Sequence, residues 1–408
     1  ALGTKTDLTK IKSYIDGERR GGHLTLTLVD ECDELTQGKG HNSLKVPKNE
    51  DPDEYQSFIP LENRGEDDEH APHVVPGSAQ ARQKSIKERI AAASHYFKEH
   101  IHPRTQIIAC SATLTGYILN PIGVFRNDLI TPIFSVFPKP GYVGIHTFKI
   151  PEGCALYGDG NMPLESFKNS PAVHTMLQRF YDQKNACDGV ILQPRDLNSR
   201  VKPVTLRGML FISCHTAVNV HGGVDDFARE VTRIVNGWGT AHDAAKTLFV
   251  CFVGKPRVFF AGKWLKMSAG ASFEAIYNET ARQARLGKFE NVSLAKDEPL
   301  SQICTRCVLI GYSMTRRAMT AAFTPKDEPD VLYKIQYGIL TAPKFLTIDA
   351  VSQRVNRPSH EFALHEVPEN FCIDVTMNPT TLRLCQFYRQ LEDKMAADQR
   401  EKPVIHSE

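Results

Sequence analysis

The stretch LVDECDEL (residues 28–35) joins a run of strand-forming apolar residues to a cluster of carboxylates. A second run of the same kind, IIACSAT (107–113), ends in small hydroxyl residues. Apolar runs that end in polar turns are typical of buried strands, and ligands of α/β proteins bind where such strands end. The two stretches therefore predict an α/β protein with a functional site at the carboxyl ends of its strands.

The rest of the chain alternates between strand-like and helix-like patterns. Strands are predicted at residues 23–29, 105–110, 207–214, 247–254, 258–262 and 307–313, and helices at 5–15, 79–100, 224–238 and 378–400. This alternation favours parallel α/β sheets. Residues 36–77 lack periodicity and contain the acidic cluster GEDDEH with several prolines, which predicts a mobile, solvated insertion.

Composition limits the class of protein. The 408 residues are enough for two or three domains, and the net charge of +2 excludes a global basic field, so any nucleic-acid surface must be local. Ten scattered cysteines are typical of reduced thiols in an intracellular protein. Neither a membrane-spanning run nor a signal peptide is evident, and the start at Ala1 suggests a fragment or a processed piece.

Asp30 and Glu31 follow the first apolar run directly. An aspartate at the end of a strand can hold Mg²⁺, usually through water, and the adjacent glutamate can polarise the water that attacks a γ-phosphate. An acidic turn between a strand and a helix is the alternative explanation of the same residues. Ser111 and Thr113 after the second run would sit beside this cluster, or they are turn and cap residues.

Two downstream segments carry arginines. GYSMTRRAMT (311–320) follows a strand, and SQRVNRPSH (352–360) offers Gln353, Arg354 and Arg357. The planar fork of donors on arginine matches a phosphate group. Taken singly, either segment is equally consistent with a surface cluster of ion pairs.

With these four clusters in this order, the chain resembles the Z1-domain proteins, a branch of the superfamily 2 helicase-like P-loop ATPases. KTDLTKIKSYI, VDECDE, CSATLTGYILNPI and FPKPGYVGIHTF are similar to consecutive motifs of that family. MLFISCHTAV resembles the strand that opens its second motor domain, LIGYSMTRRAMT its GGNKLSRGLT motif, and DAVSQRVNRPSH its Q-x-x-R motif. The match extends along most of the chain.

The resemblance implies two RecA-like parallel-sheet domains with ATP and Mg²⁺ between them. The expected domains are 1–150, incomplete at its N-terminus, and 206–370, joined by 151–205 and followed by a helical extension, 371–408. The implied catalytic residues are Asp30 (also the Mg²⁺ ligand through water), Glu31, Arg317 and Arg357. The residues implied to contact the nucleotide are Asp33, Ser111, Thr113, Thr320 and Gln353. The implied function is an ATP-dependent motor that pulls on DNA, or alternatively RNA, through backbone contacts.

Departures from the family pattern leave a second hypothesis open. Ala318 and Asn356 replace glycines, and His360 stands where helicases generally carry a finger arginine. The phosphate loop G-x-x-x-x-G-K-[ST] is absent from the sequence. Either the chain is a non-hydrolysing module that binds nucleic acid or protein, or the loop comes from residues before Ala1 or from another chain. In the latter case the intact parent is the enzyme and this chain alone is inactive.

Other residues have both a chemical and a structural interpretation. CTRC (304–307) is a single C-x-x-C, for which buried thiols at a strand start are favoured over a metal site. Asp225 and Asp226, near His215 and His221, are expected in the first turn of a helix. Trp238 and Trp264 are expected in a core, with stacking on bases as the alternative.

Overall fold

In a computed structural model, the chain divides into two compact units, Ala1–Ile133 and Phe134–Glu408. The division falls before the expected boundary at residue 150. The structure describes residues 13–14, 16–18, 20–21, 26–30, 106–110, 141–157, 162–196, 200–213, 223–239, 244–252, 256–268, 271–289, 292–311, 322–341, 351 and 355–401. Each unit is described by itself.

The first unit contains two parallel strands, β1 (Leu26–Asp30) and β2 (Gln106–Cys110). Their register runs without a shift from Leu26 opposite Gln106 to Asp30 opposite Cys110. These strands confirm the predictions at 23–29 and 105–110 and their expected parallel pairing. The predicted insertion at 36–77 and the predicted helix at 79–100 lie outside the described residues.

The second unit is built on a ten-stranded sheet whose main path is β4-β14-β12-β6-β10-β7-β8-β9. All neighbours from β4 to β7 are parallel, and β8 and β9 are added antiparallel. The path strands are β4 (Phe148–Lys149), β6 (Val204–Ser213), β7 (Thr247–Phe252), β8 (Arg257–Phe260), β9 (Lys263–Lys266), β10 (Arg306–Gly311), β12 (Val331–Ile339) and β14 (Ile373–Thr376). β5 (Ile191–Leu192) and β11 (Ala322–Phe323) pair antiparallel with β6 and β12. The unit is therefore an α/β fold with a mixed, mostly parallel sheet.

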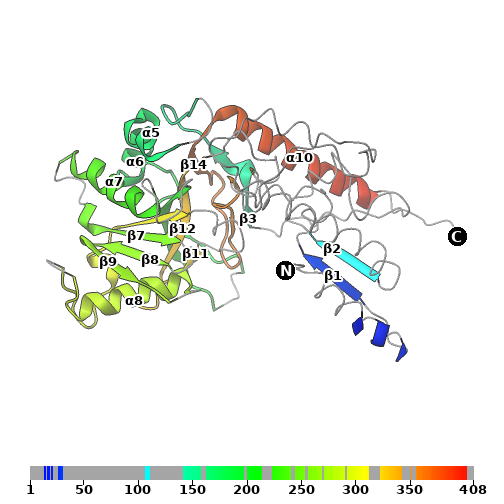
Figure 1. Ribbon diagram of the computed structural model, residues 1–408, viewed down its shortest axis with the longest axis horizontal. Coiled ribbons are helices and arrows are strands. Elements are labelled where there is room, and N and C mark those ends of the chain that lie inside the picture. Colours follow the sequence, from blue (N-terminus) through cyan, green and yellow to red (C-terminus); the bar gives the residue numbers. More distant parts are fainter. Residues whose placement is uncertain are drawn as a thin grey trace, which may run out of the picture. The chain divides into compact units, whose positions relative to one another are not determined.

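Helices cover both faces of this sheet (Figure 1). Three lie on one face, α5 (Leu164–Asn169), α6 (Pro171–Tyr181) and α7 (Val224–Asn236), and α8 (Phe273–Arg285) lies on the other. Strands between two helical layers must be apolar on both sides, and every residue of β7, TLFVCF, is buried. The continuous apolar runs seen in the sequence thus form the centre of the sheet.

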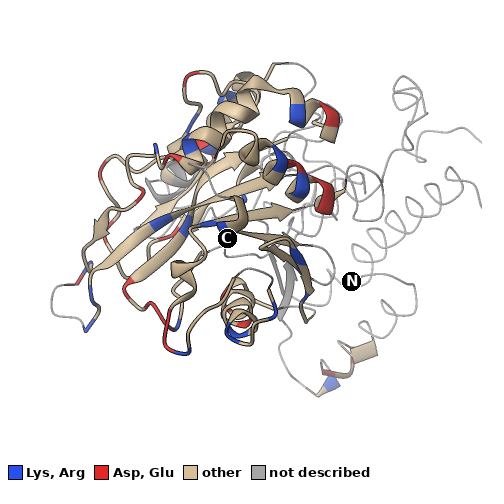
Figure 2. Cartoon of the chain, turned by 90° about the vertical axis from the view of Figure 1, so that its left-hand side faces the viewer, with Lys and Arg blue, Asp and Glu red and all other residues tan. Residues whose placement is uncertain are grey.

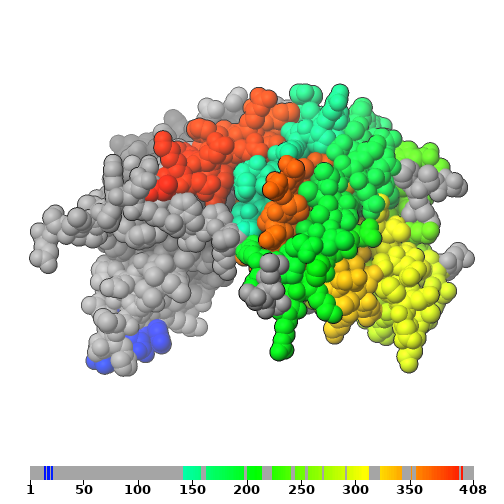
Figure 3. Space-filling model, turned by 180° about the vertical axis from the view of Figure 1, so that it is seen from behind, coloured from blue at the N-terminus to red at the C-terminus, as the bar shows by residue number. Residues whose placement is uncertain are grey.

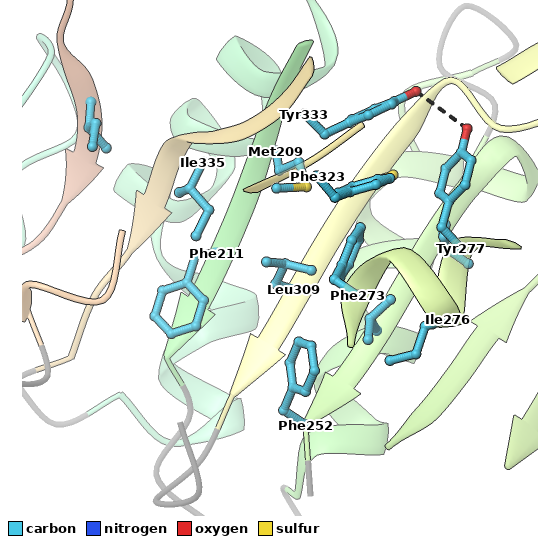
Figure 4. Close-up of a cluster of buried hydrophobic side chains, with 14 of the residues drawn as sticks. Met209, Phe211, Phe252, Phe273, Ile276, Tyr277, Leu309, Phe323, Tyr333 and Ile335 are labelled. Carbon is cyan, nitrogen blue, oxygen red and sulfur yellow. Dashed lines mark hydrogen bonds between the residues drawn. The ribbon is translucent and has the colours of Figure 1, made fainter. Parts of the chain in front are cut away.

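Successive residues of each strand enter different cores. On β6, Leu210 and Ile212 pack against α5, α6 and α7, whereas Met209 and Phe211 pack toward α8. Figure 4 shows the second core, where side chains of α8, β6, β10 and β12 meet and Tyr277 bonds to Tyr333. Charged residues lie mainly in helices and connecting segments, with a few in strands (Figure 2).

Some elements were not predicted from the sequence. Residues 151–205 were expected only as a connection, but α5, α6 and β5 within them pack on the sheet of the second unit. Strand β12 carries a bulge, because its register with β6 shifts between Ile335 and Tyr337. The extra residue is Gln336, and it interrupts the apolar alternation that sequence analysis depends on.

A small second sheet and a long helix complete this unit. β13 (His360–Glu361) pairs antiparallel with β3 (Tyr142–Val143). Helix α10 (Pro379–Glu401) confirms the predicted helix at 378–400. Its Gln386 amide donates hydrogen bonds to the carbonyl oxygens of Ile145 and Phe148, at 3.1 and 3.2 Å, which ties the helix to the segment between β3 and β4.

Candidate functional site

The carboxyl ends of β1 and β2 lie level in the first unit. Asp30 is the last residue of β1 and lies opposite Cys110, the last residue of β2. In the sequence, Glu31 follows Asp30 and Ser111 follows Cys110, and both lie outside the described residues. Segments that are far apart in sequence are joined here by the parallel pairing alone.

The side chains of this first cluster are not described. Asp30 is described in its backbone, and Glu31, Asp33, Ser111 and Thr113 lie outside the described residues. The register of β1 and β2 describes the backbone of Asp30 alone, and the positions and roles of the other four residues stay predictions.

The second unit has a comparable edge at the carboxyl ends of its parallel strands. Ser213 at the end of β6 lies opposite Gly311 at the end of β10, and Gly311 lies opposite Phe252 at the end of β7. From β6 the chain first builds the sheet on the side of β10 and β7, and later on the side of β12 and β14. Such a reversal of direction marks the place where open α/β sheets bind ligands.

Two buried hydroxyl groups lie at this reversal point. Thr341 Oγ1 donates to the Ser213 carbonyl oxygen at 3.2 Å, and the two side-chain oxygens are 3.4 Å apart. The segment that contains Arg317 and Thr320 follows Gly311, and the segment that contains Gln353 follows Thr341. These three residues lie outside the described residues, but both of their segments leave from this edge of the sheet.

Arg357 is described and is partly buried. It lies in a tight turn, because the Ser359 amide donates to the Asn356 carbonyl oxygen at 3.0 Å. Val355 before the turn is fully buried, and β13 begins directly after it. Arg357 thus lies in a short turn between the buried Val355 and strand β13.

His360 does not fit the finger position expected from the family pattern. It is only 5% exposed, and its ring packs edge-on against Phe362 and Phe371, with centroid distances of 5.2 and 5.6 Å. Burial, together with the nearby charge of Lys334, lowers the pKa of His360 to about 3. The side chain is therefore a neutral core residue, which has no charge to offer to a phosphate.

Lys334 is a residue that sequence reasoning missed. It lies on β12 and is 3% exposed; its Nζ donates to the Glu361 carbonyl oxygen at 2.6 Å and lies 4.6 Å from the centre of the Phe362 ring. Burial lowers its pKa to about 8, although the charge of Glu361 opposes this shift. The sequence feature that could have predicted a buried lysine is its position within the strand-like run VLYKIQYGI.

Several structural interpretations of the sequence are confirmed. Asp225 and Asp226 lie in the first turn of α7, and Asp225 forms an ion pair with Arg257. Cys304 and Cys307 are buried thiols at the start of β10. Trp264 is partly buried against Phe259, with ring centroids 5.0 Å apart. Trp238 also packs against the core.

Comparison with protein families, with curated proteins and with solved structures gives no match for this chain. Within the described ranges, no three His, Cys, Asp or Glu side chains are grouped so that they could hold a metal ion. No helix in the described part of the chain is long and apolar enough to cross a membrane.

Proposed function

We propose that this chain is the core of a helicase-like, ATP-dependent nucleic-acid translocase of the Z1 type, with two RecA-like domains. The observation that supports this proposal best is the parallel, in-register pairing of β1 with β2. This register sets Asp30, the first residue of the acidic cluster, opposite Cys110, which directly precedes Ser111 in the sequence. Motors of superfamily 2 need these two clusters together, because the hydroxyl residues link the carboxylates to the neighbouring domain.

The sheet of the second unit supports the same proposal. Segments with Arg317 and with Gln353 and Arg357 both follow strands that end at the carboxyl edge, next to the Ser213–Thr341 pair. Arginines that approach a nucleotide from this edge would contact its phosphates through paired donors. Two parallel sheets with polar clusters at their carboxyl edges are what a two-domain motor of this class requires.

Within this proposal each residue has a defined role. Asp30 would hold Mg²⁺ through water and Glu31 would polarise the attacking water, while Arg317 and Arg357 would contact phosphates of ATP. Asp30 fits because it is the last residue of β1 and because a carboxylate offers the oxygen ligands that Mg²⁺ prefers. The remaining residues proposed to line the nucleotide are Asp33, Ser111, Thr113, Thr320 and Gln353. DNA is the proposed partner, with RNA as the alternative.

A non-hydrolysing binding module is the second candidate function. It is favoured by the absence of G-x-x-x-x-G-K-[ST] from these 408 residues and by the burial of His360 where a charged finger is expected. A phosphate loop supplied by a longer form of the chain, or by a second chain, would restore the first candidate.

The experiment that separates the two candidates begins upstream in the reading frame. If a phosphate loop is encoded there, ATP hydrolysis is measured on the longer chain with and without single-stranded DNA or RNA. Glu31→Gln should reduce the stimulated rate roughly 10²- to 10⁴-fold, the range for loss of a general base, while ATP binding remains. The control is Glu274→Gln, an exposed glutamate in the first turn of α8.

Equal rates for wild type and Glu31→Gln would remove Glu31 from the mechanism. If no phosphate loop is encoded, titration of the present chain with ATP and Mg²⁺, and separately with single-stranded DNA, tests the binding module. Binding of nucleic acid without hydrolysis would favour the module, and binding of neither would reject both candidates.

A further inference from the structure

The segment that begins with β13 is held against the rest of the second unit by hydrogen bonds from different parts of the chain, three of which involve Glu361 and Phe362. The Phe362 amide donates to the Gly141 carbonyl oxygen at 2.8 Å. Lys334 Nζ donates to the Glu361 carbonyl oxygen, and Arg195 Nη2 donates to the Phe362 carbonyl oxygen, each at 2.6 Å. Figure 3 shows the orange segment around residues 360–370 at the molecular surface, beside green residues near 200.

His360 is the first residue of this strand, and its hydrogen bonding fixes its protonation state. Its Nδ1 lies 2.9 Å from the Pro358 carbonyl oxygen. Because a carbonyl oxygen only accepts, the ring proton must be on Nδ1. Nε2 is buried and has no hydrogen-bond partner among the residues that the structure describes, so it carries a free lone pair beside two phenylalanine rings.

A proton on Nε2 would be strongly disfavoured while β13 is docked. Among the titratable and charged groups of the elements packed here, Lys334 of β12 and Arg195 of the segment after β5 donate to carbonyl oxygens of this strand segment, and Glu361 of β13 pairs with Tyr142 of β3. Among these, Lys334 opposes protonation of His360 by charge repulsion. The new N–H donor would also be buried without an acceptor, and a buried charge without a partner is costly.

We propose that His360 is an acid-sensitive latch: in its neutral form it keeps β13 docked on the sheet, and its protonation releases β13 together with the turn that carries Arg357. Release of the strand exposes the imidazole to water, where the proton is stable. The consequence for nucleotide binding through Arg357 rests on the proposed function, whereas the release itself does not.

The expected size of the effect follows from linkage. In the docked state burial lowers the pKa of His360 to about 3, and in the released state it returns to about 6.5. Released protein therefore binds more protons below pH 6.5, so docking is fully stable above about pH 7 and weakens as the pH falls. Between pH 7 and pH 5, the equilibrium constant for opening should rise about 25-fold.

Hydrogen exchange of the full chain tests the latch without any ligand. Protection of the peptide that covers residues 360–366 is measured at pH 5, 6 and 7, after correction for the intrinsic exchange rate. His360→Phe removes the titrating group and suits the aromatic surroundings. The matched control is His365→Gln, because His365 is also buried but its Nε2 lies 3.0 Å from the Lys202 carbonyl oxygen.

We expect the protection factor of this peptide to fall about 25-fold from pH 7 to pH 5 in the wild type and in His365→Gln. In His360→Phe it should stay constant. Constant protection in the wild type, or an equal loss in His360→Phe, would overturn the latch. An equal loss in peptides of β10 would overturn it as well, because it would show global unfolding. If His360→Phe does not fold, the wild-type profile decides: it must bend near pH 6.5, and a bend elsewhere rejects His360.

The link to Arg357 has a separate readout. Affinity for ATP, measured on the longer chain if one is needed, should weaken between pH 7 and pH 5 more in the wild type than in His360→Phe. Equal weakening in both would overturn the link to Arg357. Loss of protection in a protein that binds no nucleotide at any pH would reject the proposed function and leave the latch standing.

Discussion

The two ends of the parallel strands in the second unit use polar groups differently. Toward the amino ends, charged and hydroxyl side chains bond to one another inside the fold, as Arg179 does with Asp374 at 2.7 Å. At the carboxyl ends, the described polar side chains include the short hydroxyls of Ser213 and Thr341, and the arginine-bearing segments follow. Polar bonds thus stabilise the amino end, whereas the carboxyl end combines the ion pair of Asp225 with Arg257 and the candidate chemistry.

Several hydrogen bonds of this kind join helices to strands at the amino end of the sheet. Tyr277 of α8 donates to Glu328 at 3.2 Å, and Ser301 donates to the other carboxylate oxygen of Glu328. Arg306, at the start of β10, donates to the Tyr181 carbonyl oxygen at 2.7 Å and so ties the end of α6 to the sheet. Buried polar groups that are bonded in this way fix the positions of helices relative to strands.

Breaking the Arg179–Asp374 pair should have the largest effect on stability. Arg179→Met leaves Asp374, whose side chain is 6% exposed, as a buried charge without its partner, which costs about 3–5 kcal/mol. Urea unfolding measures the loss. Arg282→Met is the control, since its pair with Glu279 lies on the surface, where water and salt screen the attraction, and its loss should be much smaller. Similar losses in both variants would contradict the difference between the two ends.

Replacing Lys334 should stabilise the fold, because its buried ammonium bonds, within the described part of the chain, to a backbone carbonyl oxygen and not to a carboxylate. Its pKa falls from 10.5 in the unfolded chain to about 8 in the fold. The unfolded chain therefore binds more protons between these values, and this group makes wild-type stability rise with pH across that window. Lys334→Met should be about 1–3 kcal/mol more stable than wild type at pH 7.

The difference between wild type and Lys334→Met should shrink as the pH approaches 10, and urea unfolding at pH 7, 8.5 and 9.5 measures it. Lys263→Met is the control, because Lys263 makes a similar bond to the Lys288 carbonyl oxygen on the surface. A constant difference at all three pH values would rule out titration of Lys334 as the cause.

A smaller loss is expected when one neutral donor is removed from the amino end. Tyr277→Phe keeps the ring in the core but removes the hydroxyl that bonds to Glu328, which should cost about 1–2 kcal/mol. Thermal unfolding is a suitable measurement, and Tyr157→Phe, at a side chain that is 86% exposed, should leave it unchanged. An unchanged midpoint for Tyr277→Phe would show that Ser301 satisfies Glu328 alone.

The smallest change is expected at the carboxyl end. Ser213→Ala removes a weak contact between neutral hydroxyls, at 3.4 Å, and should cost about 1 kcal/mol or less. A loss larger than that of Tyr277→Phe in the same urea experiment would mean that this edge also holds the fold together, and would weaken the assignment of the two ends.

The sequence predicted three strands and an amphipathic helix of the second unit correctly, but it missed other elements of the same sheet. The strands at 207–214, 247–254 and 307–313 and the helix at 224–238 all exist, because long buried runs and amphipathic periods are strong signals. β12 was missed because Lys334 and Gln336 break its apolar pattern, and both act through partners that are distant in sequence. Local patterns carry no information about such partners.

The candidate site was predictable only in part, for the same reason. Strand ends could be located, and the pairing of Asp30 with Cys110 confirms that β1 and β2 end level, whereas Glu31, Asp33, Ser111 and Thr113 lie outside the described residues. The burial of His360 could not be predicted, because it results from packing against Phe362 and Phe371 in the fold and not from a pattern in the adjacent sequence. A motif gives the order of residues along the chain. The burial of a side chain in the fold then determines whether it can carry a charge or contact a ligand.

One edge of the ten-stranded sheet also has a consequence for assembly. β9 is the outermost strand on its side, consists of KWLK, and carries an exposed lysine at each end. An unpaired edge strand invites the strand of another molecule, whereas a short strand with terminal charges repels a second copy of itself. Lys263 and Lys266 should therefore limit edge-to-edge aggregation when the protein is concentrated, independently of any role in catalysis.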